Sequence, residues 1–162
     1  MWLLGATKRQ ASALQIEGFL LSSAIVLPDK IAAYRATAYC VEAIEPPFVL
    51  RIGEPSKALQ CLYASTGTWC GLFITAFNPY GRRREEAANQ SAHRVLGRRL
   101  AALTLHVFDG AGRDTLGEWP AEKSFLALGI NGDIAAQLGK EFGQDAIVWC
   151  GVDAVPELVL LR

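Results

Sequence analysis

Two short polar stretches hold the side chains best suited to binding or chemistry, and the first begins where an apolar run, residues 69–77, ends at Asn78. Three consecutive arginines start at Arg82, and Asn89 follows. Carboxamides orient a ligand through hydrogen bonds, and guanidinium groups at a helix start attract carboxylates and phosphates. We therefore expect Asn78, Arg82 and Asn89 to bind a ligand. Two alternatives stay open: the amides hydrogen-bond to their own loop, or the arginines belong to a solvated helix face.

The second polar stretch, residues 117–124, contains Glu122 and Ser124. Residues two apart on a strand share one face, so the carboxylate and the hydroxyl are expected to point the same way. Glu122 is a candidate general base or ligand anchor, and the alternative is a surface ion pair with a loop arginine. Ser124 lacks the G-x-S-x-G context of a hydrolase nucleophile, so it is a ligand-binding candidate. Trp119, which precedes a proline, is expected to line a pocket.

Hydrophobic periodicity and turn residues predict the elements that position these stretches. Helices are predicted at residues 28–34, 55–66, 85–101 and 131–142, with Gly67 and Gly143 ending two of them and Asn131 as an N-cap. Strands are predicted at residues 36–43, 48–52, 69–77, 103–108, 124–128, 146–150 and 157–161. The first two strands are expected to pair antiparallel. The fold class is a single-domain α/β (or α+β) protein with a mixed six- to seven-stranded sheet and three to four helices.

The strand at 69–77 is almost wholly apolar, which predicts a central position with Leu72, Phe73 and Ile74 buried. Because the first polar stretch follows this strand, we expect it at one edge of the sheet. We expect Glu122 and Ser124 to reach the same edge and complete a shallow cleft. In the 85–101 helix, the predicted apolar stripe consists of Ala88, Ala92, Val95, Leu96 and Leu103.

The sixteen basic and sixteen acidic residues cancel, so no global field attracts nucleic acid or an anionic membrane. No aromatic residues alternate with the arginines, and we expect no nucleic-acid partner. A small anionic molecule is the expected ligand, and a homodimer is compatible with the sequence.

Cysteine and histidine spacing predicts neither a metal site nor a cofactor. The four cysteines form no C-x-x-C pair, and the two histidines, His93 and His106, are far apart and are expected to be structural. The cysteines lie in apolar surroundings, which predicts buried, reduced thiols and a cytoplasmic location. The glycines at 110 and 112 are expected to form a turn and are too few for a dinucleotide-binding loop.

The N-terminal segment is expected to lie outside the domain. Residues 18–27 are apolar but too short to span a bilayer, and no signal-peptide pattern frames them. We expect residues 1–27 to be an extension, helical or disordered, and residues 28–162 to be the globular domain, with no membrane association.

Motifs spread along the chain resemble a known family. They are Tyr34 to Thr37, Ile74 to Pro79, Asn89, Trp119 with Pro120, Glu122, Ser124 to Leu126, and Phe142 to Trp149. Together, over about Ile31 to Arg162, they resemble the bacterial Domain of Unknown Function 3293 family. Lys123 stands where that family tends to have proline, and Asp145 where asparagine is common. The resemblance implies a domain boundary and residues of interest, but no activity.

Three classes of function remain open. The first is a small binding or regulatory domain for an anionic small molecule or a protein partner, which the basic loop and the amides favour. The second is an enzyme that acts on a small polar substrate, with Glu122 as general base. The third is a structural or oligomer-forming protein, which would expose an apolar face and have no pocket.

Overall fold

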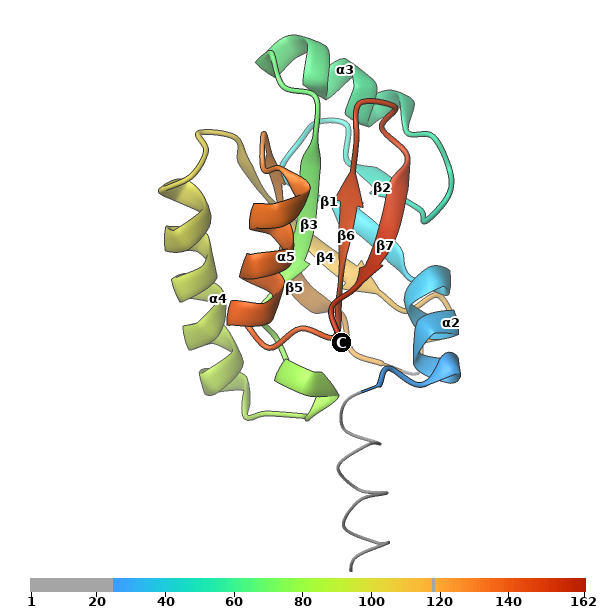
Figure 1. The fold of residues 1–162 in the computed structure, drawn as a ribbon, viewed down its shortest axis with the longest axis vertical. Helices are drawn as coiled ribbons and strands as arrows, with labels where there is room; N and C mark the ends of the chain where they lie inside the picture. The colour runs from blue at the N-terminus through green and yellow to red at the C-terminus, as the bar shows by residue number, and fades with distance from the viewer. Residues whose placement is uncertain (1–24, 118) are drawn as a thin grey trace, which may run out of the picture.

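The computed structural model describes residues 25–117 and 119–162, so the prediction for residues 1–24 lies outside the described residues. Four α-helices, one 3-10 helix and seven strands form the described part (Figure 1). In chain order they are α2 (Pro28–Ala36), β1 (Ala38–Val41), β2 (Phe48–Leu50), α3 (Lys57–Thr66), β3 (Gly71–Thr75), η1 (Pro79–Gly81), α4 (Glu86–Ala101), β4 (Val107–Arg113), β5 (Glu122–Leu128), α5 (Gly132–Glu141), β6 (Ala146–Cys150) and β7 (Pro156–Leu160).

The strands form one seven-stranded sheet in the order β2-β1-β4-β5-β3-β6-β7. This confirms the predicted fold class and the antiparallel pairing of the first two strands. The sheet differs from the expected mixed one because every pairing in it is antiparallel. The order makes β3 central, between β5 and β6, as its apolar sequence predicts.

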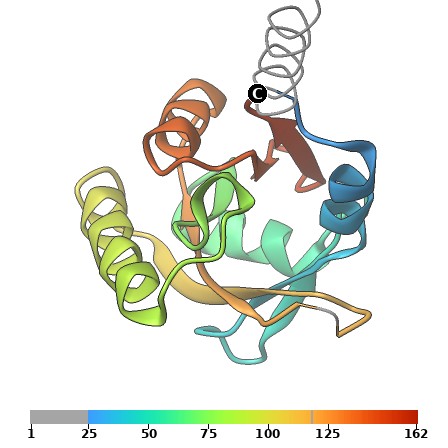
Figure 2. The same ribbon diagram turned by 90° about the horizontal axis from the view of Figure 1, so that it is seen from below.

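Helices cover both faces of the curled sheet (Figures 1 and 2). On one face, α4 and α5 lie side by side and bury Leu96, Leu100 and Leu138 against Leu72 and Ile74 of β3. The opposite face carries a second cluster that includes residues of α3, namely Leu59 and Tyr63, together with Tyr39, Phe73, Leu126 and Val148. Leu72, Phe73 and Ile74 are therefore all buried, as predicted.

Local signals in the sequence set several helix ends. The side-chain Oδ1 of Asn131 accepts from the backbone N–H of Ile134, which caps α5, and Oγ of Ser56 accepts from the backbone N–H of Leu59, which caps α3. Gly67 ends α3 with a φ of 68° and Gly143 follows α5 with a φ of 65°, the left-handed conformation that glycine adopts most easily.

The buried stripe of α4 is rotated from the predicted one. Its buried residues are Asn89, Leu96 and Leu100, whereas Ala88 is exposed and Val95 is 40% exposed. The helix turns Asn89 inward because that side chain has hydrogen-bond partners in the loop after β3. This rotation lets a polar residue occupy a position on the packed face.

The predicted turn at residues 109–112 is instead part of β4, which runs from Val107 to Arg113. Gly110 pairs with Val41 of β1 on one side and Ser124 of β5 on the other. A Cβ at Gly110 would lie 2.5 Å from the backbone oxygen of Cys40 and 3.0 Å from the ring of Phe73. The glycine thus makes room for close packing inside the sheet instead of forming a turn.

The cysteines correct a further expectation. Cys70 and Cys150 are buried, but Cys40 is intermediate and Cys61 is exposed on α3. Among the described helices, none combines the length and the apolar character that crossing a bilayer requires.

Candidate functional site

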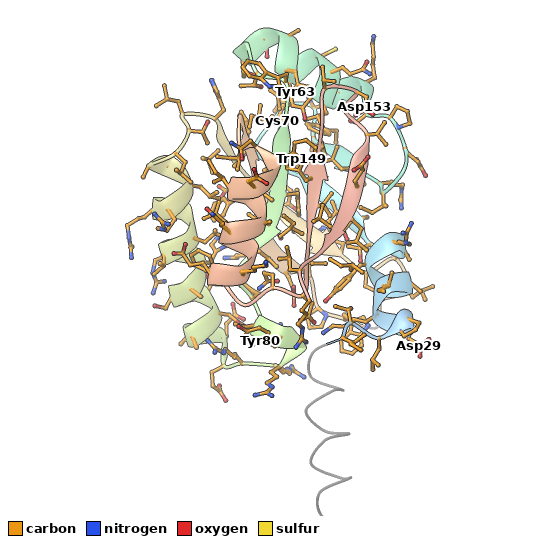
Figure 3. All side chains as sticks on the ribbon, in the orientation of Figure 1. Asp29, Tyr63, Cys70, Tyr80, Trp149 and Asp153 are labelled. Atoms are coloured by element: carbon orange, nitrogen blue, oxygen red, sulfur yellow. The ribbon has the colours of Figure 1, made fainter. Side chains whose placement is uncertain are left out.

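The candidate site is built on the loop that follows β3, at the end of the molecule opposite α3. Tyr80 of this loop and Tyr63 of α3 mark the two ends in Figure 3. Asn78 and Tyr80 have φ values of 46° and 56°, and Gly81 has 66°. Left-handed conformations at non-glycine residues cost about 1–2 kcal/mol each, and they persist where surrounding contacts impose them.

Two asparagines impose the conformation at Asn78. The backbone N–H of Asn78 donates to Oδ1 of Asn89 at 2.9 Å, and Nδ2 of Asn89 donates to Oδ1 of Asn78 at 3.0 Å. The same Oδ1 accepts from the backbone N–H of Arg84 at 3.0 Å. Because Asn89 is only 3% exposed, these bonds are shielded from water and hold the loop against the first turn of α4.

Glu122 joins this pair from the neighbouring strand. Nδ2 of Asn78 donates to Oε1 of Glu122 at 2.7 Å. The contact follows from the register, because β5 pairs with β3 so that Ser124 faces Thr75. The structure therefore brings Asn78, Asn89 and Glu122 together at one edge of the sheet, as predicted. Each asparagine also bonds to the loop itself.

A groove of about 600 Å³ lies over these three residues. We call it the Asn78 groove, and it is lined by Phe77, Asn78, Arg83, Arg84, Glu85, Glu86, Asn89, Pro120, Ala121 and Glu122. Both arginines and the glutamates at 85 and 86 are exposed, whereas Glu122 is half-buried. Figure 2 looks at this end and shows the loop after β3 between α2 and α4.

Burial shapes the electrostatics of Glu122. Burial raises the pKa of the Glu122 carboxyl above its ordinary value, because a charge loses solvation in a low-dielectric surrounding. The hydrogen bond from Asn78 and the charge of Lys30 oppose this shift without cancelling it. Within the described residues, Oε1 has Asn78 as its donor and no hydrogen bond reaches Oε2.

A buried carboxylate, Asp145, supports the loop from the other side; the sequence marked it as a departure from the family's usual asparagine and gave it no role. Its side chain is 1% exposed; Nζ of Lys30 binds Oδ2, and Nε of Arg162 lies 2.5 Å from Oδ1. Burial alone would raise the pKa of Asp145, but the hydrogen bonds from Lys30 and Arg162 hold it below its ordinary value. The guanidinium of Arg162 also lies 5.3 Å from the ring centroid of Tyr80.

Helix α2 and the loop before β6 press directly on the strained loop. The backbone N–H of Tyr80 donates to the oxygen of Gly143 at 2.7 Å. A Cβ at Gly143 would lie 2.9 Å from Cβ of Pro79, and a Cβ at Gly81 would collide with Nζ of Lys30. Tyr34 of α2 also lies in this region, with its ring centroid 6.0 Å from Nζ of Lys30. Burial and then the charges of Asp145 and Glu122 raise the pKa of Tyr34.

Three other candidates from the sequence lie outside the groove lining. Arg82 is exposed beside it, and Arg83 and Arg84 line it instead. Trp119 is 69% exposed, and its neighbours Pro120 and Ala121 line the groove. The hydroxyl of Ser124, which is 2% exposed, donates to the backbone oxygen of Glu122 at 3.0 Å. Ser124 faces a smaller cavity of about 270 Å³, together with His93, Asp109 and Lys123.

His93 illustrates how a histidine can be held by packing alone. Its ring stacks on Phe125 with centroids 4.2 Å apart and meets the edge of Phe77 at 6.0 Å. Its buried Nδ1 has no hydrogen-bond partner within the described chain. In the same part of the chain, no group of three or more His, Cys, Asp or Glu residues is placed to hold a metal ion.

Comparison with known proteins gives a match to a family model over part of the chain. Neither the curated proteins nor the solved structures provide a significant match to the chain. A family model with the description "Protein of unknown function (DUF3293)" matches residues 74–147. The matched segment begins in β3 and ends in β6, so it includes Asn78, Asn89, Glu122 and Asp145. Over these residues the chain is similar to the family of proteins of unknown function DUF3293, which supports the resemblance carried by the sequence motifs.

Proposed function

We propose that this protein is a small binding domain that holds a small molecule with an anionic group in the Asn78 groove. The observation that carries the proposal is the lining itself: Arg83 and Arg84 border the groove, and Glu122 is fixed at its floor by Asn78. Guanidinium groups bind carboxylates and phosphates with paired hydrogen bonds. An exposed pair beside a fixed polar floor is therefore suited to an anion that needs orientation.

The strained loop adds support from conformational energy. Left-handed Asn78 and Tyr80 lower stability, and contacts to Asn89, Glu122 and Gly143 help to offset this cost. Strained backbone of this kind clusters at ligand sites, where it preorganises polar groups before the ligand arrives. The first turn of α4 also favours an anionic ligand. Its N-cap residue, Glu85, makes no side-chain capping hydrogen bond, so the positive end of the helix dipole is not neutralised by that side chain.

A thermal-shift screen with small carboxylates and phosphates tests the proposal. A ligand at 100 times its dissociation constant stabilises the native state by about 2.7 kcal/mol, which raises the melting temperature measurably. Arg83→Gln combined with Arg84→Gln should abolish the shift while keeping the backbone N–H that binds Asn78. The matched control is Arg82→Gln, a neighbouring arginine outside the lining, which should keep it. Equal shifts in all variants, or no shift with any anion, would overturn the proposal.

An enzyme is the second candidate, and Glu122 is the observation that favours it. A half-buried carboxyl with a raised pKa, one oxygen fixed and the other free of hydrogen bonds in the described chain, has the features of a general base. Glu122→Gln keeps the size of the side chain and an oxygen for Asn78. If the bound ligand is consumed by the wild type and merely bound by this variant, the enzyme reading holds. A ligand that both proteins leave unchanged excludes it.

A further inference from the structure

We infer that the ligand of the Asn78 groove is zwitterionic: a small molecule that carries a primary ammonium group close to its anionic group, as α-amino acids do. This inference rests on the proposed function and names its ligand class. It comes from the charges that line the groove and from how each of them is already used within the chain.

The charged side chains of the lining disfavour a ligand that is only anionic. They comprise two arginines, at 83 and 84, and three glutamates, at 85, 86 and 122. With Glu122 ionised, the described residues of the lining carry one more negative charge than positive. An anion without a positive group would gain at the arginines but meet repulsion at the carboxylates, whereas a zwitterion is complementary to both.

Glu122 is the carboxylate best placed to hold the ammonium. Glu85 and Glu86 are exposed to water, and Oε1 of Glu86 already accepts from Gln90 at 2.6 Å. Glu122 is half-buried, so its charge is screened less and an ion pair there is stronger. Asn78 occupies Oε1 alone, which leaves Oε2 to accept from a ligand N–H.

The side-chain oxygens of Asn78 and Asn89 already accept hydrogen bonds within the chain, so Glu122 is the group at the floor that can accept from the ligand's ammonium. Oδ1 of Asn78 already accepts from both Asn89 and the backbone of Arg84. Oδ1 of Asn89 accepts from the backbone of Asn78. A ligand donor therefore finds a carboxylate, not an unused carbonyl, at the floor of the groove. An acceptor-only ligand would leave Oε2 of Glu122 desolvated without a partner, which costs binding energy.

The backbone of Arg84 lies close to the carboxylate of Glu122. A path from the backbone nitrogen of Arg84 to Oε1 of Glu122 crosses hydrogen bonds of 3.0 and 2.7 Å and one carboxamide. These two atoms therefore lie within about 8 Å of each other, given standard amide bond lengths. Because the side chain of Arg84 starts this close to Glu122, one small ligand can contact a guanidinium group and the Glu122 carboxylate at once, as an α-amino acid would.

Matched ligands test the inference. Isothermal titration is carried out with free α-amino acids, their N-acetyl derivatives, which lack the ammonium, and their carboxamides, which lack the carboxylate. We expect the free amino acid that binds best to lose about tenfold or more in affinity on either change, the effect of losing a hydrogen bond between charged groups.

Variants locate the effect. Glu122→Gln should weaken binding of the free amino acid by about tenfold or more and leave the weak binding of its N-acetyl derivative unchanged. Glu141→Gln, which removes an exposed carboxylate of α5 outside the groove, is the control and should bind like the wild type.

The outcomes separate the two proposals. If N-acetyl amino acids or simple carboxylates bind as tightly as free amino acids, and Glu122→Gln has no effect, the zwitterion inference is wrong while the binding function stands. If no carboxylate or phosphate of any kind binds, the proposed function fails and the inference fails with it. If the N-acetyl and carboxamide derivatives bind more weakly than the free amino acid, and Glu122→Gln weakens binding of the free amino acid, both proposals are supported.

Discussion

Asn78 and Glu122 lie 44 residues apart in the chain and share a hydrogen bond of 2.7 Å between Nδ2 and Oε1. The opposite end of the same carboxamide accepts from Asn89 and from the backbone of Arg84. One side chain thus connects the end of β3 to α4 and to the start of β5. Any change at Asn78 is expected to reach the stability of the loop and the shape of the groove together.

The first prediction separates the backbone of Asn78 from its side chain. Asn78→Ala and Asn78→Gly both remove the carboxamide, but only glycine adopts a φ of 46° without strain. We therefore expect the free energy of unfolding of the alanine variant to be about 1 kcal/mol lower than that of the glycine variant. Chemical denaturation of the two proteins measures the difference. Equal stabilities would show that the left-handed conformation is not imposed in solution.

The second prediction concerns the glycines of β4. A Cβ at Gly110 would lie 2.5 Å from the backbone oxygen of Cys40, so Gly110→Ala must displace β1 and should cost about 1–3 kcal/mol. Gly112→Ala, in the same strand, is the control. Its Cβ would approach nothing closer than Cγ2 of Thr37 at 3.8 Å, and alanine favours a strand over glycine by about 0.5–1 kcal/mol. A tolerated Gly110→Ala would contradict the packing described for this strand.

These glycines also show why part of the fold escaped prediction from the sequence. Aspartate and glycine at 109 and 110 are turn residues by local propensity, and that propensity predicted a turn. The strand forms because β4 pairs with β1 and β5, and Gly110 fits in the narrow space between Cys40 of β1 and the ring of Phe73. Neither neighbour is near in sequence, so the reason for the strand lies in tertiary packing.

The site divides along the same line. The position of Asn78 was predictable because it follows a strongly apolar strand, and that of Asn89 because it lies near the start of a patterned helix. Glu122 was predictable because its polar stretch separates two apolar strands. The ion pairs that Asp145 forms with Lys30 and Arg162 were not predictable, since Lys30 and Asp145 are 115 residues apart and no local pattern relates them. Trp119 and Arg82 carried strong local signals, but small changes in loop direction decide which neighbour lines a groove.

The third prediction contrasts a buried ion pair with an exposed one. Asp145→Asn removes a carboxylate that is 1% exposed and that contacts both Lys30 and Arg162, and should cost about 1–3 kcal/mol. Glu141→Gln breaks the pair with Arg99, in which both side chains are roughly half exposed, and should cost less than about 1 kcal/mol. Urea denaturation at neutral pH measures both variants.

Acid provides the control for Asp145. Its pKa in the folded protein lies below the ordinary value of 3.8. Its contribution to stability is therefore complete above that value and is lost as the pH falls below it. The difference between wild type and Asp145→Asn should shrink in that range. A difference that is unchanged at strongly acidic pH would mean that packing, and not charge, explains the loss.

The last prediction concerns His93. Burial lowers its pKa below the ordinary value of 6.5; Asp109 opposes the shift and Lys123 adds to it. Since the unfolded chain binds the proton more readily, the free energy of unfolding should fall as the pH drops below about 6.5 and level off below the folded pKa. His93→Phe keeps an aromatic ring between Phe77 and Phe125 without a titrating group, so this part of the pH dependence should disappear.

At neutral pH, His93→Phe should also be more stable than the wild type by about 1 kcal/mol, because it removes a buried Nδ1 that has no hydrogen-bond partner in the described chain. His93→Gln is the companion variant, since it cannot titrate either but loses the stacking on Phe125. It should therefore be less stable than His93→Phe at every pH while sharing its flatter profile. Glu42 and Asp109, which line the cavity beside the ring, remain in all three proteins, so the comparison isolates the imidazole. A wild-type slope below pH 6.5 that both variants retain would show that the slope does not come from His93.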